Sequence, residues 1–196
     1  MIVWFGFAIL AIAIVGAIVV IQQRKSLPGK RTAALPTLKR NIFTLQIGDI
    51  VQYEGRDWVV EGRLTFDDSG YTWMEYMLQD GDDLRWLSVE EDDRVEVCWM
   101  KTVTDLEISR TPPQTISHNG ITYHRTNQGT AKMTRVGTTL NKQSQHCRYY
   151  DYDAPNNQVL AVETWNDDHE VSVGQRINPR ALMLLPGDGK RVYDDV

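Results

Sequence analysis

Cysteine is scarce in this chain, which has only Cys98 and Cys147 among its 196 residues. A small secreted domain held together by disulfides contains a denser set of cysteines, so nothing in the sequence demands an oxidising compartment. The two cysteines and four histidines also lack the CxxC or HxxxH spacing that is typical of a zinc site. We therefore expect no metal ion and no other cofactor.

The motifs of common catalytic sites are missing as well. The chain has no GxSxG motif, no Gly-rich dinucleotide motif and no EF-hand loop, and residues 187–190 (GDGK) lack the surrounding pattern of a phosphate loop. His146 and Cys147 are sequence neighbours, and neighbouring strand residues point to opposite faces, unlike the two members of a Cys/His catalytic pair. These absences predict a protein that is not an enzyme. A hydrolase with an unrecognised site is kept as a third hypothesis, after the binding domain and the ligand sensor that are described below.

Negative charge is absent from residues 1–40, which carry six basic residues, whereas all 26 acidic residues of the chain follow them. The part of the chain after residue 40 is therefore strongly acidic, because it holds 15 of the 21 lysines and arginines against all 26 acidic residues. An acidic domain repels the phosphates of DNA and RNA. We expect no nucleic-acid partner.

A long hydrophobic run opens the chain, since residues 2–21 contain no charged side chain. As a helix, a run of this length spans about 30 Å, which is the thickness of a bilayer core. No basic residue precedes the run, and the run is longer than the apolar core of a cleaved signal peptide. The pattern predicts one transmembrane helix over residues 1–22.

The basic residues that follow this run predict its orientation. Residues 23–41 form a proline-containing basic linker, and the positive-inside bias places the domain after it on the cytoplasmic side, with the N-terminus outside or in a lumen. Four linker side chains are expected to lie against anionic lipid headgroups, namely Arg24, Lys25, Lys30 and Arg31. An effect on topology alone explains these residues equally well.

A helical stripe is absent after residue 41, and short alternating runs take its place. Val95, Val97 and Trp99 alternate with more polar residues, as in a strand with one buried face. Clusters of Asp, Asn, Gly and Pro separate such runs at the spacing of turns. The pattern predicts an all-β soluble domain, an antiparallel sandwich or barrel.

The β-rich part also contains an internal resemblance. Residues 53–58 (YEGRDW) and residues 118–123 (HNGITY) both place a large aromatic residue three positions after a glycine. Further matches join Gly62 with Gly129, residues 87–90 with 160–163, and residues 95–97 with 171–173. We interpret these as an internal duplication, with repeats over 42–110 and 111–187 and a tail over 188–196. Chance similarity among hairpins is the alternative.

Several of these segments together resemble a known family. They are residues 47–51 (IGDIV), 53–55 (YEG), 58–62 (WVVEG), 73–78 (WMEYML) and 84–90 (LRWLSVE). Across roughly residues 44–187 the chain is similar to the domain-of-unknown-function family 4178, which is bacterial and brings no established activity. Members with a single anchor of this kind resemble cyanobacterial proteins, which implies a thylakoid or plasma membrane.

One aromatic residue has polar neighbours and is the candidate for partner binding. Trp165 lies in residues 163–168 (ETWNDD), so we expect it to be exposed beside Asp167 and Asp168. The leading hypothesis is a membrane-anchored, non-enzymatic domain that binds a membrane protein or complex as scaffold, assembly factor or accessory subunit. The alternative is a sensor that holds a small molecule or lipid inside a barrel, which a pocket lined by Tyr and Trp would distinguish.

Overall fold

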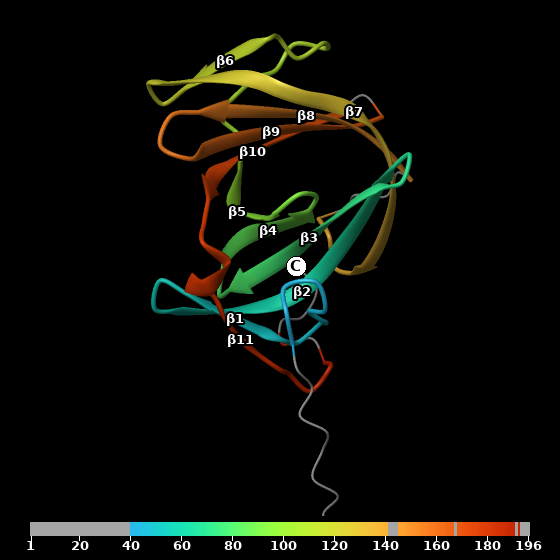
Figure 1. Cartoon of the computed structure of the whole chain (residues 1–196), viewed down its shortest axis with the longest axis vertical. Helices are drawn as coiled ribbons and strands as arrows, with labels where there is room; N and C mark the ends of the chain where they lie inside the picture. Colours follow the sequence, from blue (N-terminus) through green and yellow to red (C-terminus); the bar gives the residue numbers. More distant parts are fainter. Residues whose placement is uncertain (1–39, 141–144, 167, 191, 193–196) are drawn as a thin grey trace, which may run out of the picture. The chain divides into compact units, whose positions relative to one another are not determined.

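The computed structural model describes residues 40–140, 145–166, 168–190 and 192. These residues form an antiparallel β domain with a single short 3-10 turn (Figure 1). The predicted transmembrane helix and the linker as far as residue 39 lie outside the described residues. Within the described part of the chain, no helix has the length and apolar character needed to cross a membrane.

The strands follow one another through short turns over most of the domain. Their bounds are β1 Ile50–Tyr53, β2 Arg56–Asp68, β3 Tyr71–Asp80, β4 Asp83–Glu91, β5 Val95–Val103, β6 Thr115–His118, β7 Ile121–Gly137, β8 His146–Ala154, β9 Gln158–Trp165, β10 Asp168–Arg176 and β11 Met183–Leu185, with the 3-10 turn η1 at Pro179–Ala181. Their order in the sheet is β11-β1-β2-β3-β4-β5-β10-β9-β8-β7-β6.

Two long strands close this sheet into a barrel. β2 has 13 residues and β7 has 17, and each pairs with different neighbours along its length. β2 pairs first with β1 and then, over residues 62–67, with β7, so that eight strands from β2 to β7 form a closed ring. The all-β prediction is confirmed, and the closed ring identifies the domain as a barrel rather than a sandwich.

The two halves of the barrel have the same strand order, β1 to β5 and β6 to β10. The turns that precede β2 and β7 are also alike, because Glu54 and Gly55 have positive φ angles, as do Asn119 and Gly120. Trp58 and Tyr123 are each the third residue of the strand that follows. β11 is the exception to the repeat, since it lies in the second range of sequence but pairs with β1.

A β-bulge interrupts both long strands and refines the predicted alignment of the halves. It falls between Val60 and Gly62 in β2 and between Arg125 and Asn127 in β7. Gly62 therefore corresponds to Asn127, and its predicted match with Gly129 is wrong. The two glycines also lie against different groups. A Cβ at Gly62 would clash with the backbone of Thr138, whereas a Cβ at Gly129 would clash with the side chain of Tyr149.

A second predicted match is shifted by two residues. Val89 pairs with Val97 across β4 and β5, and Val162 pairs with Val171 across β9 and β10. If residues 87–90 match 160–163, then Val97 corresponds to Val171, whereas the sequence match placed it at Val173. Strands of alternating valines match equally well when shifted by two residues, because the side chains keep the same face.

Three apolar clusters stabilise the domain. The first lies inside the barrel and includes Phe66, Trp73 and Trp86. The second packs on the outer face of β1 to β5 beneath Phe43 and Leu184, and the third packs on the outer face of β6 to β10. Alternation of side chains along each strand lets one strand serve an inner and an outer cluster.

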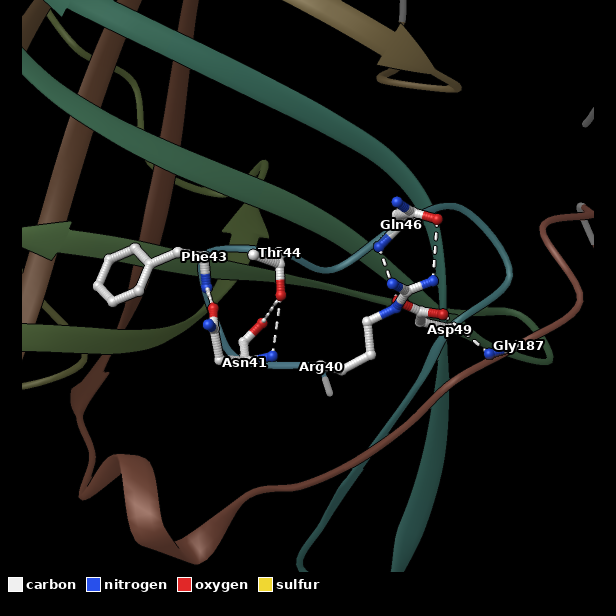
Figure 2. Close-up of polar contacts among 7 residues, drawn as sticks. All are labelled: Arg40, Asn41, Phe43, Thr44, Gln46, Asp49 and Gly187. Atoms are coloured by element: carbon white, nitrogen blue, oxygen red, sulfur yellow. Dashed lines mark hydrogen bonds and ion pairs between the residues drawn. The ribbon is translucent and has the colours of Figure 1, made fainter. Parts of the chain in front are cut away.

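A buried ion pair holds the beginning of the described chain against the barrel (Figure 2). Arg40 Nε donates to Asp49 Oδ2 at 2.6 Å, and the backbone N–H groups of Gln46 and Gly187 each donate to the same carboxylate at 2.8 Å. The side chains of Arg40 and Asp49 are only 7% and 1% exposed. One carboxylate thus joins residue 40, the start of β1 and the segment that follows β11.

Candidate functional site

A cavity of about 180 Å³ lies in the barrel, with walls from both halves of the chain. Three aromatic residues on inward positions contribute to it, namely Tyr71, Trp73 and Tyr149. Trp73 stacks on Phe66 with ring centres 4.7 Å apart and meets Tyr149 edge-on at 5.0 Å. These contacts hold the aromatic wall in place, so the cavity is supported by the inner apolar cluster.

Acidic residues dominate the polar part of this lining. Six carboxylates contribute to the wall, namely Glu75, Glu90, Glu96, Asp151, Asp153 and Glu163, whereas Arg176 is the single Lys or Arg among the described residues that line it. Carboxylates are rarely placed inside a domain, because removing their charge from water is costly. Their concentration here indicates a site that attracts cations.

Arg176 neutralises one end of the cavity. Its Nε donates to Glu96 Oε2 and its terminal nitrogen to Asp153 Oδ1, both at 2.8 Å. Burial alone would raise the pKa of Glu96, but hydrogen bonds from Arg94 and Arg176 hold that pKa below its ordinary value. Because Arg176, Glu96 and Asp153 remain partly exposed, this group lies where the cavity meets solvent.

Asp151 on β8 has a different environment. Burial raises its pKa to about 7, and the negative charges of Glu90, Glu163 and Asp153 act in the same direction, while Arg176 opposes them. Within the described part of the chain its carboxylate has no hydrogen-bond donor. At neutral pH Asp151 therefore exchanges a proton readily, and a cation in the cavity would favour its ionised form.

Tyr71 and Tyr149, the tyrosines on inward positions at the cavity, are neutral hydrogen-bond donors. Tyr71 donates to Glu90 Oε2 at 2.6 Å, and burial together with this bond raises the pKa of Tyr71. Tyr149 donates to Asp68 Oδ2 at 2.9 Å, and burial raises its pKa to about 12. The thiol of Cys98 also lines the cavity, but burial raises its pKa to about 12, so it is a poor nucleophile.

Of the predicted partner-binding residues, Trp165 is buried and Asp168 is exposed. Trp165 is only 8% exposed and packs against Phe66, and its Nε1 donates to Glu163 Oε2 at 3.2 Å. The expectation that Trp165 is exposed is wrong, because it continues the inward face of β9 two residues after Glu163. Asp168 is exposed at the start of β10, and Asp167 lies outside the described residues.

The remaining predicted residues can also be placed. Arg24, Lys25, Lys30 and Arg31 lie outside the described residues, so their membrane contact stays a prediction. On β8, His146 is exposed and Cys147 is buried, which confirms that these neighbours face opposite ways. Among the residues that the structure describes, no three His, Cys, Asp or Glu side chains are grouped to hold a metal ion.

Sequence reasoning missed the acidic cavity, although a signal for it exists. Asp151 lies in residues 149–153 (YYDYD), and Glu163 lies between apolar residues and Trp165. In each case a carboxylate occupies a position that the strand alternation assigns to the buried inner face. A charged residue on the apolar side of a strand pattern was the feature that could have identified the site.

Comparison with known proteins places the chain in a family. Residues 46–179 match the family model described as Domain of unknown function (DUF4178). The chain is also 34% identical, over 148 residues, to the uncharacterized protein Mb2628 of Mycobacterium bovis and to the uncharacterized protein Rv2597 of Mycobacterium tuberculosis. Each match covers 71% of this chain and 70% of the relative, and no solved structure matches. The chain therefore belongs to the DUF4178 family of domains of unknown function.

Proposed function

We propose that the barrel is a binding domain for a small organic cation. One observation carries this proposal, namely a cavity of about 180 Å³ whose lining combines four aromatic residues, three of them on inward positions, with six carboxylates and one arginine. An ammonium group is attracted to the faces of Trp and Tyr and forms strong hydrogen bonds to carboxylates. The same wall repels anions, and a purely apolar ligand would leave the carboxylates poorly solvated.

The size of the cavity limits the ligand. An apolar cavity of about 150 Å³ accommodates benzene, so a cavity of this volume suits a group of roughly six to ten non-hydrogen atoms. A folded lipid is too large for it. This size, together with the aromatic and acidic wall, favours a sensor that holds a small molecule over a sensor that holds a lipid.

Placement at a membrane remains part of the proposal. If residues 2–21 span a bilayer, the barrel would sample the solution on the side that the basic linker selects, which we propose is the cytoplasmic side of a plasma or thylakoid membrane. Binding of the cation in the barrel would then change how the domain contacts a membrane protein or complex. Trp165 no longer supports that contact, because it is buried.

Calorimetric titration of the full chain in mild detergent tests the proposal. We expect butylamine to bind, and we expect butanol and butyrate, which match it in size, to bind at least tenfold more weakly. Asp151→Asn should weaken butylamine binding about tenfold, because it removes a charged hydrogen-bond partner.

The matched control is Glu107→Gln, which removes an exposed carboxylate outside the cavity and should change nothing. Equal affinity for butanol and butylamine would contradict the proposal, as would equal effects of the two substitutions.

A further inference from the structure

The cavity that carries the proposed function is followed by two further hollows, each of which shares lining residues with the one before it. The second hollow shares Glu75, Ser88, Met100, Ala161 and Glu163 with the first and adds Glu170 on β10. The third, a groove of about 520 Å³ at the ends of β5 and β9, in turn shares Glu170 with the second. The shared residues place the three hollows in series along the barrel, from Arg176 to the surface at Asp168.

The second hollow is narrow and acidic. Its volume is about 10 Å³, which is close to the minimum that holds one water molecule and therefore suits a group of ammonium size. Its charged residues are Glu75, Glu163 and Glu170. Glu163 and Glu170 are direct partners across β9 and β10, so their carboxylates contribute negative potential at the same point.

The spacing of the acids matches two cationic groups in line. Asp151 is paired with Ala161, and Glu163 follows Ala161 by two residues on β9. Two residues of a strand rise about 7 Å, which a short alkyl chain between two nitrogen atoms can span. Met100 and Ala161 line both hollows and supply an apolar wall for that chain.

We propose that the ligand is a linear amine with two or more ammonium groups. The first ammonium is held by Asp151 and Glu90 beside the aromatic wall, and the second by Glu163 and Glu170. The groove beyond Glu170 allows a longer amine to extend toward Trp165 and Asp168. This inference rests on the proposed function and specifies the class of ligand for the same barrel.

A series of amines tests this inference on the full chain by calorimetry. We expect putrescine and spermidine to bind about tenfold more tightly than butylamine, because the second ammonium gains a charged contact. Glu170→Gln should weaken putrescine and spermidine about tenfold and leave butylamine unchanged. Asp151→Asn should weaken all three amines, and Glu107→Gln should weaken none. Thermal unfolding of each variant checks that it is folded.

The outcomes separate the two proposals. If no amine binds, the proposed function itself fails. If butylamine binds as tightly as spermidine and Glu170→Gln has no selective effect, the ligand is a compact cation and only this inference is overturned. If Glu107→Gln weakens spermidine as much as Glu170→Gln does, the amines bind to surface charge and the inference is equally overturned.

Discussion

Two aspartates, the buried Asp49 just before β1 and the partly buried Asp151 on the cavity wall, experience opposite surroundings. Asp49 accepts hydrogen bonds from Arg40 and from the backbone of Gln46 and Gly187. Asp151 has no hydrogen-bond donor among the described residues and faces other carboxylates, which together with burial raise its pKa to about 7. The described part of the chain provides hydrogen-bond donors to the carboxylate of Asp49 and none to that of Asp151.

The difference teaches how to separate a structural charge from a functional one. A buried carboxylate costs several kcal/mol unless partners compensate for the lost water. At Asp49 the compensation is internal, so this group serves folding. At Asp151 the described residues supply no hydrogen-bond donor to the carboxylate, so a bound cation would compensate for part of this cost. We therefore assign the Asp49 network to stability and keep the Asp151 cavity as the proposed binding site.

The largest expected effect is on the structural side of this comparison. Asp49→Ala should lower the free energy of unfolding by about 3–5 kcal/mol, because it leaves a buried guanidinium and two backbone N–H groups without their acceptor. Urea denaturation of the full chain measures this. Asp188→Ala is the control, since that side chain is 69% exposed and its loss should cost less than about 0.5 kcal/mol. Similar losses for both variants would contradict the structural role of Asp49.

The second largest effect is expected at Trp165, which, like Asp49, stabilises the fold. Trp165→Ala should destabilise the domain by about 3 kcal/mol, because it removes a large side chain that packs on Phe66 inside the barrel. Thermal unfolding provides the measurement, and Trp165→Phe should recover part of the loss. An unchanged melting temperature would restore the earlier hypothesis of an exposed anchor.

The fold was predictable because its main signal is local. Alternation in residues such as Val95, Val97 and Trp99, together with the turns at Gly55 and Gly120, predicts antiparallel strands and their repeat. Closure of the barrel was not predictable, because it depends on pairing between residues 62–67 and β7, more than sixty residues away. Local patterns specify which face of a strand is buried but not which distant strand covers it.

The site was harder to predict, because polar neighbours in sequence do not report exposure. Trp165 follows Glu163 and Thr164, yet Trp165 and Glu163 share the inner face and Thr164 is buried on the outer one. Asp151 was overlooked for the same reason, since an acidic residue between tyrosines reads as an ordinary solvated position. Only the closed barrel shows that carboxylates from several strands face one cavity.

A smaller effect is expected from Asp151, whose ionisation should make the stability of the domain depend on pH. The pKa of Asp151 is 3.8 for the isolated group and about 7 in the folded domain, so the folded state binds more protons between these values. Stability is therefore lost as pH rises from about 4 to about 7, and the loss is complete above that range. Asp151→Asn should increase stability by about 2 kcal/mol near pH 8, with the gain fading toward pH 4.

Urea denaturation at several pH values measures this gain. Asp153→Asn is a useful comparison, because it removes the negative charge that forms an ion pair with Arg176 and should not stabilise the domain. A gain of equal size at every pH would indicate that the substitution acts through packing rather than through ionisation of Asp151.

The smallest effect is the pH dependence of amine binding, and it connects the stability and binding arguments. A cation in the cavity favours ionised Asp151, so binding below the pKa of about 7 must release a proton. The affinity for butylamine should therefore rise up to tenfold per pH unit below about pH 7 and level off above it, while the amine itself stays charged. Calorimetry in two buffers of different ionisation enthalpy counts the released protons directly. In Asp151→Asn the affinity should be lower and nearly independent of pH over the same range. If the wild-type affinity is flat with pH while butylamine still binds, the amine does not contact Asp151, and the acids nearer Arg176 would have to hold it.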